Sequence, residues 1–135
     1  MNKEKLKEIY TKYQLEKDDI FILKFGGKDK PIITRSGIER IQAILGIECT
    51  FKIEKISEDH KSVIIMGTGC IFKSDDRGQK MPKVMAQSFG EVSPANNRSS
   101  YPVAMAEKRA LGRVVLKMAN LFGFYSEDEA EEFKK

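Results

Sequence analysis

Residues 62–72 read SVIIMGTGCIF, a largely apolar run with polar turn sequences on both sides, SEDH at residues 57–60 and SDDRG at residues 74–78. A short run rich in β-branched and apolar residues between such turns predicts a buried β-strand. Gly67 and Gly69 lie inside the run, where glycine marks a bulge or the close approach of another backbone. We therefore expect a central strand here with something packed tightly against its middle.

The segments on both sides of this strand predict its two partners. Residues 48–56 (ECTFKIEKI) alternate between apolar and polar side chains, as a half-buried strand does. Residues 83–92 (KVMAQSFGEV) predict a third strand. Because both connections are short turns, the three strands are expected to form an antiparallel meander.

The remaining elements are predicted from hydrophobic periodicity and from capping residues. They are a helix over residues 3–13, a strand over 20–25 that enters a Gly26-Gly27 turn, a hairpin partner or short edge piece over 31–34, a helix capped by Thr34 or Ser36 that runs to about residue 45 and ends at Gly46, a long helix over 101–121, and a short helix that opens with the capping-box pattern at residue 126.

These elements predict one α+β domain spanning residues 1–135, in which the antiparallel three-stranded meander packs on the long C-terminal helix and shorter helices are added. Residues 1–35 form an N-terminal helix and hairpin, residues 36–122 form the core, and residues 126–135 form an acidic C-terminal helix. The sequence contains no internal repeat and no linker.

The long helix separates its charged and apolar residues on a helical wheel. At about 100° per residue, Arg109, Arg113 and Lys117 fall on one side, and the apolar residues from Leu111 to Phe122 fall on the other. Ala106 and Ala110 lie beside the cations, where small side chains let another backbone approach closely. We expect the apolar side to pack on the sheet and the basic side to face solvent and contact a polyanion.

Further cations and polar groups surround this helix. The loop at residues 96–100 (NNRSS) offers hydrogen-bond donors for phosphate oxygens. The residues expected to contact nucleic acid are Lys108, Arg109, Arg113 and Lys117 of the helix, Arg98 of the loop, and Lys73, Arg77, Lys80 and Lys83 near the second turn of the meander. Phe25, Phe72, Phe89 and Tyr101 are either core residues or platforms on which bases stack.

Bulk composition points to a cytoplasmic, soluble chain. The formal charge is +4, but residues 126–135 (SEDEAEEFKK) hold five acids and two lysines, so the first 125 residues carry +7. A basic body with an acidic tail suits a nucleic-acid partner whose access the tail modulates. No apolar run approaches the roughly 20 residues of a membrane helix. Cys49 and Cys70 are expected to be buried free thiols.

Other site chemistries receive less support from the residues. His60 is the only histidine and is expected to be exposed in a turn, whereas catalytic triads need a packed histidine. No Cys/His spacing suits zinc. The acidic pairs at residues 18–19 and 75–76 and the acids at 127–129 leave a metal-dependent nuclease open, although each lies where acids serve turns or caps. Gly26-Gly27-Lys28 lacks the spacing of a phosphate loop. We expect no catalytic activity, no metal and no cofactor.

The order of elements resembles the Rad fifty-two superfamily of single-strand annealing proteins, and in particular its phage and bacterial relatives. The resemblance covers roughly residues 32–132. It rests on the meander ending in SFGEV at residues 88–92, the AEKRALGR helix at residues 106–113, and the YSEDE segment at residues 125–129. That family implies a β-β-β-α core, assembly into rings or filaments, and binding of single-stranded DNA along a basic groove.

By motif match, Lys108 and Arg109 would line that groove and Arg113 would join them, while the next basic position of the family corresponds to Gly112 here. We therefore expect sequence-independent binding of single-stranded DNA and annealing of complementary strands in recombination or replication, by a homo-oligomer and without nucleotide hydrolysis. The alternative is a protein-interaction module, such as a phage factor that binds a host or defence protein through the same basic face.

Overall fold

The computed structural model describes the backbone of residues 3–134 and the side chains of residues 3–130. Residues 1, 2 and 135, which end the first and last expected segments, lie outside this range. The elements are α1 (Lys3–Lys12), the 3₁₀ helix η1 (Lys17–Asp19), β1 (Ile20–Phe25), β2 (Lys28–Ile33), α2 (Arg35–Leu45), β3 (Glu48–Ile56), β4 (Val63–Ser74), β5 (Lys80–Val92), α3 (Pro102–Met118), β6 (Tyr125–Ser126) and the 3₁₀ helix η2 (Glu127–Lys134).

The strands form two sheets, which confirms the α+β class. In the larger sheet the order is β3-β4-β5 and both pairings are antiparallel. In the smaller sheet β2 pairs antiparallel with β1 along its whole length, so the segment around Pro31 is a true hairpin partner. The smaller sheet also contains β6, which pairs parallel with β2 and was not expected from the sequence.

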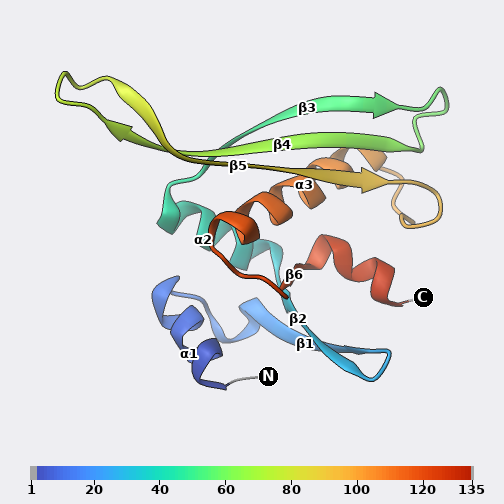
Figure 1. Ribbon diagram of the computed structural model, residues 1–135. Helices are drawn as coiled ribbons and strands as arrows, with labels where there is room; N and C mark the ends of the chain where they lie inside the picture. Colours follow the sequence, from blue (N-terminus) through green and yellow to red (C-terminus); the bar gives the residue numbers. More distant parts are fainter. Residues whose placement is uncertain (1–2, 135) are drawn as a thin grey trace.

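The two sheets lie on opposite sides of a central helical layer (Figure 1). Helix α3 contacts β4 and β5 on one side and β6 on the other, and α2 packs beside it. One hydrophobic cluster joins α1, the smaller sheet, α2 and the second half of α3, and includes Ile33, Ile41 and Val115. A second cluster lies between the larger sheet and the first half of α3, and includes Ile65 and Ala110. Helix α3 is therefore buried on two sides.

The ends of α2 follow the expected capping chemistry. The Thr34 hydroxyl accepts a hydrogen bond from the backbone N–H of Gly37 at 3.2 Å, which satisfies one free donor of the first turn. At the other end Gly46 adopts the left-handed conformation, with φ of +69°, and its N–H bonds back to the last turn. The chain then turns directly into β3.

Glycine on the sheet permits an unusually close contact between α3 and β5. A Cβ atom placed on Gly90 would lie 1.9 Å from the carbonyl oxygen of Ala106 and 2.5 Å from the nitrogen of Ala110. The backbone of β5 thus lies directly against the small residues Ala106 and Ala110 of α3. This contact fixes the position of the polar side of α3 relative to the edge of the sheet.

The hairpin between β4 and β5 projects beyond the helical layer (Figure 1). We call residues 72–84 the arm. Its apolar side chains are exposed, including Met81 at 54% and Val84 at 41% of their maximum. The strand β5 begins at Lys80, three residues before the expected start, because the arm continues the β4–β5 pairing to Ser74 and Lys80. None of the described helices is both long enough and apolar enough to span a membrane.

Candidate nucleic-acid interface

The basic row of α3 comprises Arg109, Arg113 and Lys117, and only part of it faces solvent as the helical wheel predicts: Lys117 is exposed and Arg113 is partly exposed. Arg109 is only 1% exposed. Its guanidinium donates to the carbonyl oxygens of Glu91, Asn96 and Asp128 at 2.8–3.0 Å, and also to the side chain of Asn96. The expectation that Arg109 is exposed was therefore wrong, because loop and tail residues far away in the sequence fold over it.

The three cations follow the edge of β5 at matching intervals. Arg109, Arg113 and Lys117 donate to the backbone carbonyls of Glu91, Phe89 and Gln87, at 2.9, 2.7 and 2.9 Å. Steps of four residues on a helix rise about 6 Å, and steps of two residues on a strand rise about 6.6–6.8 Å. The row therefore satisfies edge carbonyls that would otherwise be free to pair with another strand.

The acidic C-terminal segment binds the same region. Arg113 also pairs with the carboxylate of Glu129, and Asp128 pairs with Arg35 at 2.8 Å. The hydrogen bond from Arg35 to Asp128 raises the pKa of Arg35, and the negative charge of Asp128 adds to the effect. The carboxylate of Glu127 accepts from the backbone N–H of Arg35, at the first position of α2. Both Asp128 and Glu129 are buried, so the segment is part of the folded body.

The remaining expected cations lie apart from the row. Lys73, Arg77 and Lys83 are exposed on the arm, and within residues 3–130 none of their side chains has an acidic partner. Lys80 bonds to Glu48 at 3.0 Å and lies 5.0 Å from the centre of the Phe72 ring. Lys108 is half-buried on α3, and Arg98 is exposed in the loop before it. The structure thus separates the nine residues into the row on α3 with Lys108 beside it, the arm and the loop; along the row, exposure rises from the buried Arg109 to the exposed Lys117.

Besides the arm, the larger sheet has an exposed face, which points away from α3 (Figure 1). Gly67 and Gly90 face α3, so by strand alternation their neighbours face outward. No described element lies over this side. We define the open face as Thr50, Lys52, Met66, Thr68, Gln87 and Phe89, which are neighbours across β3, β4 and β5.

The four aromatic residues named from the sequence are all at least one-third exposed, so none is a core residue. Phe25 is 39% exposed, Phe72 37%, Phe89 44% and Tyr101 72%. Phe25 and Phe72 each have a lysine over the ring, and Tyr101 precedes α3 as its N-cap. Only Phe89 lies on the open face.

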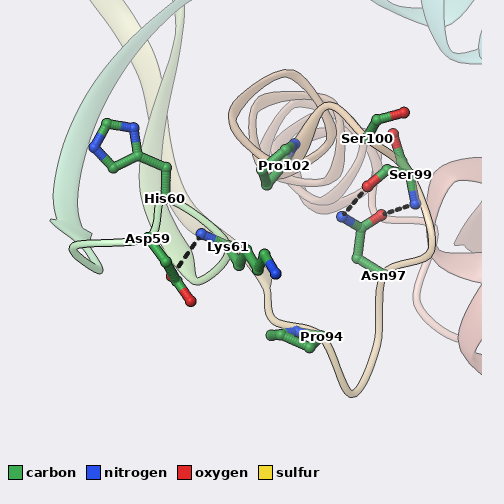
Figure 2. A pocket seen from close by; sticks show the side chains of 8 residues that line it. All are labelled: Asp59, His60, Lys61, Pro94, Asn97, Ser99, Ser100 and Pro102. Carbon is green, nitrogen blue, oxygen red and sulfur yellow. Dashed lines mark hydrogen bonds between the residues drawn. The ribbon is translucent and has the colours of Figure 1, made fainter.

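A cavity of about 490 Å³ lies at the end of the larger sheet, between the β3–β4 turn and the loop before α3. Figure 2 shows Lys61 between the turn and the loop, and the His60 ring turned away from Asn97 and Ser99. The side-chain amide of Asn97 donates a hydrogen bond to the carbonyl oxygen of Ser99 and accepts one from the backbone N–H of Ser99. His60 is exposed with φ of +60°, which confirms its turn position.

Two of the acids that left a nuclease open, Asp19 and Asp75, accept hydrogen bonds from groups of the fold. Asp19 accepts hydrogen bonds from the backbone N–H of Glu16 and from the hydroxyls of Thr34 and Ser36. Asp75 accepts from two backbone N–H groups of its own turn. Among the described residues, no three His, Cys, Asp or Glu side chains come together as a metal site would require.

Comparison of the chain with protein-family models, with curated proteins and with solved structures found no match. The case for a function therefore rests on the open face, the arm and the chemistry of their side chains.

Proposed function

We propose that this protein binds single-stranded DNA without sequence preference, and that the DNA lies on the open face and the arm. The observation that carries the proposal is the position of the unpaired cations. Lys73, Arg77 and Lys83 project on the arm beyond the helical layer and, among the described side chains, have no acidic partner. The arm continues directly from the strands of the open face.

Such a surface suits a flexible polyanion. Lysine and arginine on an accessible hairpin follow a phosphate backbone and release its counterions, which gives affinity that falls as salt rises. Single strands bend to an irregular surface, whereas a rigid duplex demands a groove-shaped match. Asp75 and Asp76 at the tip of the arm reduce its net charge. The carboxylate of Asp75 accepts two backbone hydrogen bonds within the turn, which offset part of the effect of its negative charge.

Strand annealing, and a role in recombination or replication, belong to the same proposal. The order β3-β4-β5-α3 supports a relationship to the β-β-β-α core of the Rad fifty-two superfamily. Annealing needs extended strands with accessible bases and no nucleotide hydrolysis. An assay that follows the pairing of two labelled complementary oligonucleotides tests it. Binding without faster pairing would restrict the function to DNA binding.

Assembly into a ring or filament is a further part of the proposal. The basic row occupies the carbonyls of Gln87, Phe89 and Glu91, so this stretch of β5 is closed to another strand. Pairing between copies would therefore use β3, whose register shifts after Ile53. We expect two copies to pair along the part of β3 that precedes this shift, residues 48–53, because bulges hinder strand pairing. Light scattering with and without DNA tests assembly, and a strict monomer in both would contradict it.

The first test of DNA binding compares two charge reversals of equal size. Changing Lys73, Arg77 and Lys83 together to glutamate should weaken binding of a labelled oligonucleotide at least about tenfold at low salt. The slope of log affinity against log salt should become shallower by about 2, from roughly 0.7 per phosphate contact. The control changes Lys3, Lys5 and Lys7 to glutamate; these lysines are exposed on α1, which lies on the other side of the helical layer from the larger sheet.

The control should keep most of the affinity, because its lysines lie far from the arm (Figure 1). Equal losses in both triple variants would show attraction to net charge alone and would contradict the proposed surface. Absence of binding by the unmodified protein at low salt would reject the function itself. A protein partner for the basic row is less supported, since Arg109 is buried and the other two cations bind within the chain.

A further inference from the structure

Two neighbouring rows of the open face differ in chemistry. One row crosses the sheet as Lys52, Met66 and Phe89, and the next row crosses it as Thr50, Thr68 and Gln87. Successive rows on one face are two residues apart, which is about 6.8 Å along a strand. Met66 and Phe89 thus have hydrogen-bonding side chains next to them on the side of Thr68 and Gln87.

The backbone at Phe89 is fixed, and the residue is 44% exposed. Its carbonyl accepts a hydrogen bond from Arg113, and its strand neighbour Gly90 is pressed against α3. Directly across β4 lies Met66, whose flexible thioether packs well against aromatic rings. Gln87 donates to the hydroxyl of Thr68 at 3.1 Å, so the polar row is also ordered. An aromatic side chain on a fixed backbone therefore faces outward beside ordered hydrogen-bonding groups.

Within the described residues, the hydrophobic core gives no reason for this exposure. The clusters around α3 use the opposite faces of β4 and β5, through Val63, Ile65 and Val92. Phe89 contributes to neither cluster. A protein partner would favour a large contiguous apolar patch, whereas the apolar pair of Met66 and Phe89 has Thr68 and Gln87 beside it on one side and Lys52 at its end. Unpaired bases suit an apolar row beside a polar row, since each base has a flat face for stacking and an edge for hydrogen bonds.

We infer that the open face is a base-stacking platform for unpaired nucleotides, with Phe89 as the stacking residue. Met66 borders the stacked base, Thr68 and Gln87 offer hydrogen bonds to base edges, and Lys52 lies at the end of the Phe89 row beside the phosphates. The inference rests on the proposed function and adds what that function leaves open, namely that the protein contacts bases as well as phosphates. Because paired bases are hidden inside a duplex, such a platform selects single strands.

The test separates base contacts from phosphate contacts. Two labelled oligonucleotides of equal length are compared, one of thymidines and one of abasic sites, so that the number of phosphates is the same. The unmodified protein should bind the thymidine strand at least about tenfold more tightly, because stacking of a base on an aromatic ring adds affinity that the phosphates do not supply. Phe89→Leu should lower this ratio about tenfold, and Phe89→Tyr should largely restore it.

Phe122→Leu is the matched control, because Phe122 is also highly exposed, at 71%, and belongs to the segment between α3 and β6 and not to the larger sheet. Its ratio should equal that of the unmodified protein. Equal binding of the two strands by the unmodified protein would overturn the platform and leave DNA binding intact. An unchanged ratio in Phe89→Leu, with its thermal unfolding also unchanged, would show that Phe89 is not the stacking residue. Failure to bind either strand would reject the proposed function instead.

Discussion

Arg109 shows how a charged side chain is stabilised inside this protein. Burying a guanidinium is costly unless its donors are paired. Here the N–H groups meet carbonyl oxygens of three different segments, around Glu91, Asn96 and Asp128. One side chain thus joins the end of β5, the loop before α3 and the C-terminal segment. It is the largest fully buried side chain among the described residues.

The first prediction concerns the stability that Arg109 provides. Arg109→Gln should lower the free energy of unfolding by about 3 kcal/mol or more, since each buried carbonyl left unpaired costs about 1–3 kcal/mol. Urea denaturation followed by circular dichroism measures the change. Lys117→Gln is the control from the same row. It should cost only about 1 kcal/mol, because its single hydrogen bond is exposed. Similar losses in the two variants would contradict the structural role of Arg109.

Cys49 provides a pH-dependent prediction. Burial, with a smaller contribution from Glu107, raises the pKa of this thiol to about 11. The protonated thiol is therefore favoured in the folded state, and the thiolate needed for nucleophilic attack is scarce at pH 8. Reaction with Ellman's reagent should be slow in the native protein up to about pH 10 and fast in urea. Rapid native labelling at pH 8 would contradict the raised pKa. Cys70 is buried and should react no faster.

The Cys49 pKa also has a consequence for stability. Below about pH 9 the thiol is protonated in both the folded and the unfolded chain, so it has no effect on their balance. Between pH 9 and 11 the unfolded chain loses this proton first. Stability should therefore fall as pH rises through this range.

At the residue scale, the sequence predicts the two sides of α3 but not which polar residue is buried. The helical wheel separates Arg109 from the apolar residues, and this separation exists in the structure. However, the acceptors for Arg109 come from positions 91, 96 and 128, and one sequence contains no signal that links them. Ala106 and Ala110 beside the row were a usable sign that a backbone lies close to this side of the helix.

At the scale of elements, the contact between α3 and β5 determines what the basic row does. Because Gly90 allows the helix backbone to lie against the strand, the cations reach the free carbonyls of β5. An edge strand with unpaired backbone groups can recruit another chain, and proteins often place charged residues there. In this fold the charges also bond directly to the edge.

Gly90→Ala tests this contact. The new methyl group would meet backbone atoms of Ala106 and Ala110, which cannot rotate away, so the helix must shift. We expect a loss of about 3 kcal/mol or more in the free energy of unfolding, at the upper end for overpacked cores. Gly67→Ala is the control on the same face, where the nearest atoms are side chains 3.3–3.4 Å away. It should cost clearly less, and equal costs would contradict the tight α3–β5 approach.

The elements themselves were predictable where their periodicity is long. The alternation of residues 48–56 and the apolar run of residues 62–72 correspond to β3 and β4, and the Gly46 cap ends α2 as expected. The two-residue strand β6 has too few residues to show any period. It exists because the chain after α3 returns beside β2, which is a tertiary event. The open face likewise depends on strand register, so Phe89 could be named from the sequence but not placed.

At the scale of the whole molecule, the C-terminal segment connects parts that are distant in the sequence. Its strand β6 pairs with β2, Glu127 bonds to the first turn of α2, and Asp128 contacts both Arg35 and Arg109. On the α3 side, a Cβ on Gly112 would lie 2.7 Å from Cβ of Ser126, so the segment packs tightly against the helix. The acidic residues thus bind specific partners inside the fold.

This arrangement gives two opposed expectations for removal of residues 125–135. If the acids only screened the basic surface, the shortened chain would keep its stability and bind single-stranded DNA more tightly. Because Arg109 would lose an acceptor and Arg35 and Arg113 their carboxylates, we instead expect a fall of several kcal/mol in the free energy of unfolding. Thermal unfolding by circular dichroism measures it. A synthetic peptide of residues 125–135, added in excess, should restore part of the lost stability by binding the native state. A shortened chain that melts at the original temperature would show that the segment is a screen and not part of the fold.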